Sequence, residues 1–85
     1  MNNKLGILVY AINPKNNQEP IDLFTSFPKE ENLFGRRKHL VESILNDSYV
    51  TWSGKRRKEL VARAKRNEWA IYVSIVNIAN CQKVA

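Results

Sequence analysis

The alternation of apolar and polar positions predicts a hairpin at the start of the chain. Residues 5–12 are apolar on both faces of an extended segment, which is typical of a buried strand. Residues 13–19 have the composition of a turn, and residues 20–26 then alternate in polarity. Two such segments joined by one connection predict two antiparallel strands.

A helical period follows this hairpin. Thr25 or Ser26 is a candidate N-cap, and the period continues to about Asn46. Its apolar positions share an arc of about 140° at 100° per residue and predict a helix that packs this arc on the core. They are Leu33, Phe34, Leu40, Val41, Ile44 and Leu45. Because Gly35 costs a helix up to about 1 kcal/mol relative to Ala, a start near Asn32 is the alternative.

The remaining segments predict a second helix between two strands. Residues 49–52 alternate in polarity and indicate a short third strand, and Ser53 is a candidate cap for a helix over 55–67. Its narrow apolar stripe consists of Leu60, Val61 and Ala64. Residues 69–79 are apolar on both faces and predict a central strand. We therefore expect one α+β domain over residues 1–85, with an antiparallel sheet of three to four strands and two helices in the order ββα(β)αβ.

Strands that are apolar on both faces need cover on both faces of the sheet, and only two helices are expected. Either the helices divide between the faces, or they share one face and a second subunit covers the other. We expect the second arrangement, a homodimer.

The cysteine content and the length of the apolar stretches indicate a soluble cytoplasmic protein. One cysteine, Cys81, excludes an intramolecular disulfide, as expected in a reducing compartment. The apolar start resembles a short secretory signal, but the turn at 13–19 favours a strand. No other apolar stretch approaches the roughly 20 residues that a membrane-spanning helix needs.

The net positive charge of the chain is concentrated in one region. Residues 36–66 hold ten Lys and Arg against three acids, a net charge of +7, whereas the other 54 residues hold four cations and five acids, a net charge of −1. Such a regional field attracts polyanions, and nucleic-acid phosphates are the commonest of these in the cytoplasm.

The basic helix at 55–67 is the strongest functional signal. We expect its cations to bind nucleic-acid phosphates, DNA or RNA, over roughly 15–18 Å of helix, with two cations of the first helix extending the track and Trp52 stacking on bases. The expected cations are Lys55, Arg56, Arg57, Lys58, Arg63, Lys65 and Arg66, extended by Arg36 and Lys38. The alternative is a small accessory or inhibitor protein that docks its cationic face on an acidic or nucleic-acid-binding protein.

Two arginines and two aromatic residues in or beside the basic region have two interpretations each. Arg37 and Arg57 lie on the apolar sides of their helices, where arginines reach past the core edge or pair with a carboxylate. A shared anion pocket between the helices is the alternative. Tyr49 and Trp69 flank the basic cluster and are candidates either for the core or for base stacking.

No residue pattern indicates catalysis. His39 and Glu42 are one helix turn apart, but no nucleophile or electrophile is placed beside them. One histidine and one cysteine do not make an ordinary His/Cys metal site, and the three glycines form no phosphate loop. We predict a binding protein that is not an enzyme and has no catalytic residues, no cofactor and no metal.

Overall fold

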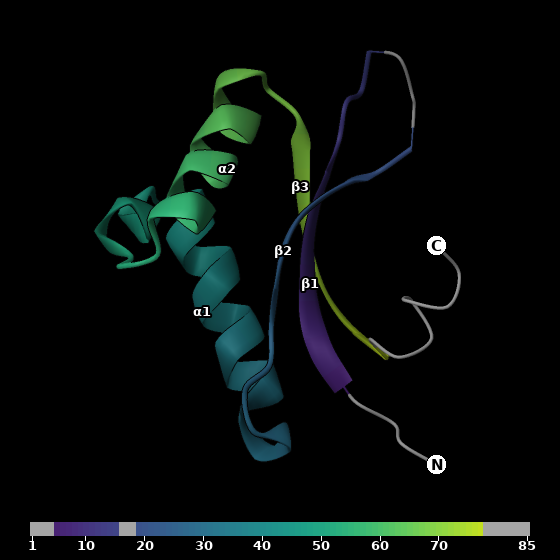
Figure 1. Cartoon of the computed structure of the whole chain (residues 1–85), viewed down its shortest axis with the longest axis vertical. Helices are drawn as coiled ribbons and strands as arrows, with labels where there is room; N and C mark the ends of the chain where they lie inside the picture. Colours follow the sequence, from purple (N-terminus) through teal and green to yellow (C-terminus); the bar gives the residue numbers. More distant parts are fainter. Residues whose placement is uncertain (1–4, 16–18, 78–85) are drawn as a thin grey trace.

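A three-stranded antiparallel sheet and two helices form two layers in the computed structural model, which describes residues 5–15 and 19–77 (Figure 1). Strand β1 (Leu5–Ile12) lies between β2 (Ile21–Ser26) and β3 (Ala70–Asn77) and is antiparallel to both. This order of strands and helices confirms the predicted α+β class and the predicted hairpin.

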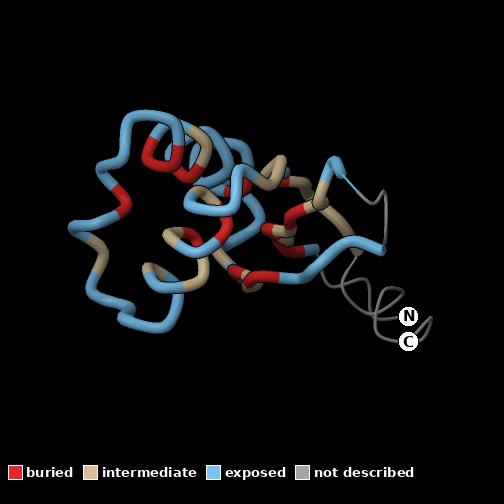
Figure 2. The backbone as a smooth tube through the Cα atoms, turned by 90° about the horizontal axis from the view of Figure 1, so that it is seen from above, coloured by how far each residue is buried: buried red, intermediate tan, exposed pale blue. Residues whose placement is uncertain are grey.

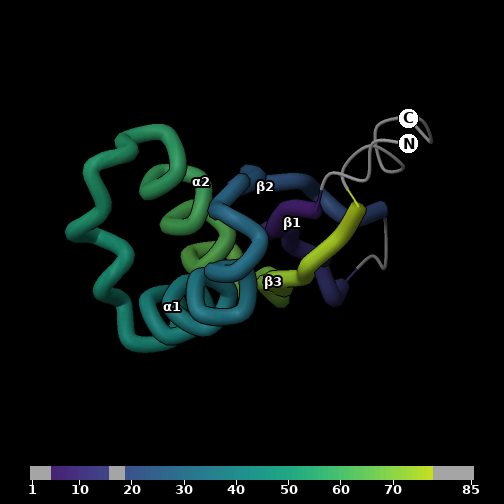
Figure 3. The backbone as a smooth tube through the Cα atoms, turned by 90° about the horizontal axis from the view of Figure 1, so that it is seen from below, coloured from purple at the N-terminus to yellow at the C-terminus, as the bar shows by residue number. Residues whose placement is uncertain are grey.

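Both helices lie on the same face of the sheet, as Figure 3 shows. Helix α1 (Leu33–Leu45) follows a 3-10 turn at Glu30–Asn32, and helix α2 (Lys55–Arg66) follows a 3-10 turn at Ser48–Thr51. Of the two arrangements that the sequence allows, the structure therefore has the shared face. No helix covers the opposite face of the sheet within the described residues.

The core lies between the two layers, and Figure 2 shows buried residues in both of them. Ile7, Val9 and Ala11 of β1 point to the helices and are fully buried, as strand alternation requires. Val61 and Ala64 of α2 are also fully buried, which confirms the predicted apolar stripe of that helix. Helix α1 contributes Leu33, Leu40 and Ile44.

The uncovered face of the sheet carries the alternate residues of the same strands. Leu8, Tyr10 and Ile12 of β1 are half-buried there. Tyr10 faces its register partner Tyr72 of β3, and their rings stack at 5.3 Å between centroids and 21° between planes. This face is therefore apolar and aromatic.

Two strand predictions are wrong. Residues 49–52 form no strand, because Ser48–Thr51 is a 3-10 turn closed by a hydrogen bond of 3.0 Å from the Trp52 N–H to the Tyr49 carbonyl. Alternation over four residues does not separate a strand from such a turn, and Tyr49 buries its side chain without joining the sheet. Strand β3 is an edge strand and not the central one. Its second apolar face lines the uncovered side of the sheet, so apolarity on two faces did not indicate a central position.

The predicted helix caps are also wrong. Ser26 ends β2 and is buried, so neither it nor Thr25 caps α1. Helix α1 has Asn32 at its N-cap, which confirms the alternative start. The N-cap of α2 is Gly54 and not Ser53, and no side chain caps it.

The predicted apolar arc of α1 wrongly assigns Phe34 and Leu45 to the core. Their side chains are 79% and 76% exposed, respectively, although the arc assigns both to the core. The two residues lie at one border of the arc, whereas Leu33, Leu40 and Ile44 at its other side are buried. The helix is therefore rotated so that this border faces solvent.

Candidate nucleic-acid interface

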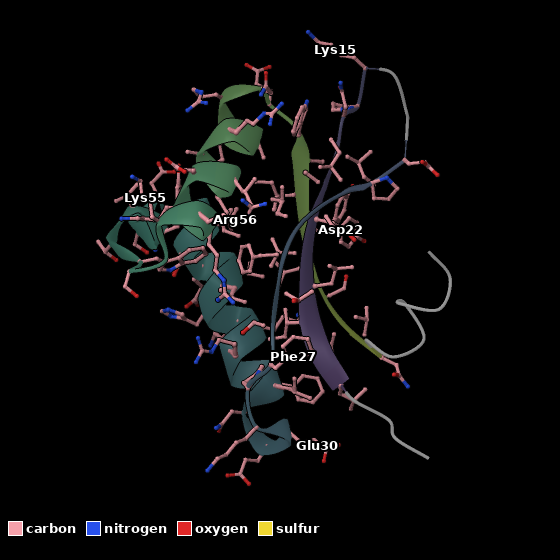
Figure 4. The ribbon with its side chains drawn as sticks, viewed as in Figure 1. Lys15, Asp22, Phe27, Glu30, Lys55 and Arg56 are labelled. Carbon is pink, nitrogen blue, oxygen red and sulfur yellow. The ribbon has the colours of Figure 1, made fainter. Side chains whose placement is uncertain are left out.

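The orientation of α2 decides which of its cations face outward. Because Val61 and Ala64 anchor the helix, the residues on the opposite side of the wheel are exposed. The cations among them are Lys55, Arg56, Arg63 and Arg66, which we call the outer ridge. Figure 4 shows Lys55 and Arg56 at the start of α2, in the helical layer and away from Asp22 on the sheet.

The outer ridge is not neutralised by carboxylates. Glu59 is the one acid on this side of α2, so four cations face one acid. Within the described residues the one ion pair joins Lys65 to Asp47, and Glu59 takes no part in it. The ridge therefore presents a net charge of about +3 to solvent.

Lys65 is held inside the fold. Its ammonium group donates to the Ile44 carbonyl at 2.6 Å, forms the ion pair with Asp47, and lies 5.6 Å from the centre of the Tyr49 ring. These contacts join the end of α1 to the end of α2. Lys58 is half-buried on the same inward side of the helix. The structure thus separates these two lysines from the outer ridge.

Arg57 is anchored to the edge of the sheet. Its Nη2 donates to the Thr25 carbonyl of β2 at 3.0 Å, and its guanidinium lies 4.9 Å from the centre of the Phe24 ring. One of the five guanidinium N–H groups is used in this way, and the side chain remains exposed. Arg57 is therefore a fixed cation with donors left for a ligand.

Arg37 is anchored to the opposite edge of the sheet, where its Nε donates to the Val73 carbonyl of β3 at 2.9 Å. It lines a groove of about 290 Å³ between α1 and β3 that Arg57 does not reach. The anion pocket shared by Arg37 and Arg57 is therefore not formed. The helical periodicity places both arginines on apolar faces, but it does not show that they bind two different edge strands.

Arg57 instead shares a pocket with Arg36 and His39 of α1. These two residues are three apart and so lie on one side of their helix. The pocket has a volume of about 180 Å³ and is also lined by Trp52 and by the start of α2. The sequence analysis missed this role of His39, although the spacing of Arg36 and His39 was a usable signal. Lys38 lies about 160° around α1 from Arg36, so the two do not form one track.

The aromatic candidates differ in accessibility. Tyr49 is buried, with 7% of its surface exposed, and belongs to the core. Trp69 is half-buried, with the guanidinium of Arg63 at 5.9 Å from its ring centre. Trp52 is half-buried in the wall of the pocket, with edge-on contacts to Phe24 and Tyr49. Of the three, Trp52 is the one that lies beside the cations of the pocket.

Residues suited to other chemistry are not assembled in the part of the chain that the structure describes. His39 and Glu42 are both exposed, and no group of three or more His, Cys, Asp or Glu side chains is placed to hold a metal ion there. Cys81 lies outside the described residues. None of the described helices is long and apolar enough to cross a membrane.

No protein-family model, no curated protein and no solved structure matches this chain. A function must therefore be argued from the geometry of the outer ridge and the pocket.

Proposed function

We propose that the protein binds the phosphate backbone of nucleic acid, without catalysis, through the outer ridge of α2. The observation that carries this proposal is the unneutralised charge of the ridge, where four exposed cations face one acid. Charge of this kind is not needed to hold α2, since Val61 and Ala64 bury its opposite side. A cytoplasmic location is part of the same proposal.

The dimensions of the ridge suit a nucleic-acid backbone. From Lys55 to Arg66 the helix rises roughly 16 Å, which is the length of about five phosphate steps along one strand of a duplex. With Arg36 of α1 and Arg57 of α2, six cations are available, enough for about five phosphate contacts. Such contacts position a strand without reading its bases, so we expect little dependence on sequence.

The test is fluorescence anisotropy with duplex DNA, single-stranded DNA and RNA across a salt series. About five phosphate contacts predict a log–log salt slope near −4 to −5 on duplex DNA and about −3.5 on single strands. Arg56→Glu should weaken binding to every nucleic acid that the wild type binds. Lys15→Glu makes the same change of charge in the turn after β1 (Figure 4) and should leave the affinity nearly unchanged.

Two results would overturn the proposal. One is the absence of binding tighter than about 100 μM at low salt, since non-specific affinities of about 10⁻⁴ to 10⁻⁶ M are typical even at physiological salt. The other is equal weakening by Arg56→Glu and Lys15→Glu, because net charge and not the ridge would then explain the binding.

A protein partner is the second candidate function, and one observation favours it. Phe34 and Leu45 of α1 are largely exposed, and phosphate binding gives no reason for this. An accessory or inhibitor protein would dock the cationic face on an acidic protein and add these apolar side chains to the contact. Phe34→Ser separates the two functions, because it should leave nucleic-acid affinity unchanged but weaken a fixed-ratio complex with an acidic protein.

A further inference from the structure

The pocket at the start of α2 is built from three separate parts of the chain. Arg36 and His39 come from α1, Arg57 comes from the first turn of α2, and Phe24 comes from β2. Leu40, which is buried, lies in the same lining. The fold thus brings two guanidinium groups and an imidazole around one space of about 180 Å³.

The pocket offers a ligand two guanidinium groups and further hydrogen-bond donors. Every polar side chain of its lining is a donor in at least one form, and no Asp or Glu belongs to that lining. Arg57 cannot swing away freely, because the Thr25 carbonyl and the Phe24 ring hold its guanidinium. A fixed arginine is pre-organised for an anion, so less entropy is lost on binding.

The backbone adds donors of the same sign. Gly54 is the N-cap of α2, no side chain caps this end, and the first turn of the helix contains no acid. The first amide N–H groups of a helix have no partner within it and carry the positive end of the helix dipole. Ser53 and Gly54 line the pocket, so this end of α2 opens toward the cations.

The size of the pocket limits its ligand. A volume of about 180 Å³ is below the roughly 300–1,000 Å³ of pockets that enclose drug-sized molecules. It suits a single phosphate group better than a whole nucleotide. A phosphate monoester carries a charge of about −1.5 to −2 and three terminal oxygens, whereas a backbone phosphodiester carries a single charge.

We propose that this pocket binds the terminal phosphate of a nucleic-acid strand, held by Arg36, His39 and Arg57. The inference rests on the proposed function, since the phosphate in the pocket is the terminal one of the strand whose backbone follows the outer ridge. Arg36 and Arg57 pair with the phosphate oxygens, His39 donates a further hydrogen bond, and Trp52 forms the wall beside the terminal nucleotide. The protein then prefers strands with a phosphorylated end.

The experiment compares single-stranded oligonucleotides of one sequence that carry a 5′-phosphate, a 3′-phosphate or hydroxyl groups at both ends. Charge-assisted hydrogen bonds to a monoester should make one phosphorylated strand about tenfold tighter than the hydroxyl strand. Arg36→Gln and His39→Leu should each reduce this ratio toward one. Both side chains are exposed, so the variants should fold as the wild type does.

Arg66→Gln is the matched control, because it removes one charge from the outer ridge at the far end of α2. It should weaken binding to phosphorylated and hydroxyl strands by the same factor and leave their ratio unchanged. Equal affinity of the wild type for all three strands would overturn the preference for a phosphorylated end while leaving backbone binding intact.

Titration with inorganic phosphate or a nucleoside monophosphate tests the pocket independently of the proposed function. Amide NMR shifts at Gly54 and Lys55 on titration with either, lost in Arg36→Gln, would support the pocket even if no oligonucleotide binds. Absence of these shifts together with equal strand affinities would exclude it.

Discussion

Lys55 and Lys65 carry the same charge on the same helix, but only one of them is engaged within the described fold. Lys65 bonds the Ile44 carbonyl and Asp47, and so ties α2 to the end of α1. Lys55 is exposed in the first turn of α2, where its charge opposes the helix dipole. A cation that opposes the dipole and bonds no described residue does not stabilise the fold, which is why we assign it to ligand binding.

Substitution of the two lysines by Met should therefore have opposite effects. Lys65→Met keeps the aliphatic stem but loses the charged hydrogen bond and the ion pair, and should lower the free energy of unfolding by about 1–2 kcal/mol. It should leave the affinity for nucleic acid nearly unchanged. Lys55→Met should leave the stability unchanged or slightly raised, and should reduce the log–log salt slope of binding by about 1. Urea denaturation and anisotropy on both variants measure these quantities.

A loss of affinity in Lys65→Met equal to that in Lys55→Met would contradict this division of α2 into an inward and an outward set. Such a result would mean that the ion pair with Asp47 opens when the ligand binds.

The positions of single cations could be predicted only in part from the sequence. The concentration of charge in residues 36–66 was visible, and the wheel placed Arg57 on the apolar side of its helix. The partners were not visible, because Lys65 and Asp47 are 18 residues apart and Arg57 and Thr25 are 32 apart. Contacts between residues so far apart in the sequence depend on how the two layers pack. The periodic pattern of apolar residues does not show this packing.

At the scale of elements, both edge strands of the sheet make the same kind of contact with the helical layer. Each edge strand offers an outward carbonyl, and an arginine from the helical layer bonds it, Arg37 on β3 and Arg57 on β2. Edge strands with free backbone groups are sites of unwanted pairing with other chains. These two arginines thus hold helices to the sheet and occupy part of each edge.

The glycines of the two helices should respond to Ala with opposite signs. Gly35 lies within α1, has a negative φ, and a Cβ atom there would meet nothing within 4 Å. Gly35→Ala should raise the free energy of unfolding by about 0.5–1 kcal/mol. Gly54 is the N-cap of α2, where Ala is unfavourable, so Gly54→Ala should lower the free energy of unfolding by about 0.5–1 kcal/mol. Thermal denaturation followed by circular dichroism measures both changes.

Stabilisation by Gly54→Ala would show that the start of α2 needs no cap of its own. The free amide groups that the phosphate pocket uses would then be a weaker feature than we infer.

Elements whose pattern repeats over many residues were predictable, whereas the short segment at 49–52 and the rotation of α1 were not. Strand β1 and helix α2 were found with nearly their observed bounds, because each repeats its pattern over eight or more residues. The segment at 49–52 was misassigned because four alternating residues fit both a strand and a 3-10 turn. Phe34 and Leu45 were misassigned because a wheel gives the width of an apolar arc but not which part of it meets the sheet.

At the scale of the whole molecule, the helical layer and the uncovered face of the sheet differ in charge. The cations of α2 lie on the helical layer, whereas Asp22 is the only charged residue in the three strands. The uncovered face of the sheet thus has almost no charge with which to attract a phosphate backbone or an acidic protein. Its aromatic and aliphatic side chains suit a neutral apolar surface, and a second copy of the same face is one.

We therefore propose a homodimer in which two sheets meet face to face and the basic helices lie outside. Size-exclusion chromatography with light scattering should give a mass of twice the 9.9 kDa of the chain, with dissociation on dilution. Tyr72 is 45% exposed and stacks on Tyr10 at this face. In a two-fold contact each substitution occurs twice, so Tyr72→Glu should bury two like charges and give a monomer.

Phe34→Glu makes the same chemical change on α1, outside the sheet, and should leave the dimer intact because Phe34 is exposed on the helical layer. A monomeric wild type at high concentration would rule out the dimer. Dissociation by Phe34→Glu and not by Tyr72→Glu would move the contact to the exposed side of α1. If the sheets do meet, the two outer ridges face away from each other, and one dimer should bind two separate nucleic-acid strands. A variant that breaks the dimer should then keep its affinity for a single short strand.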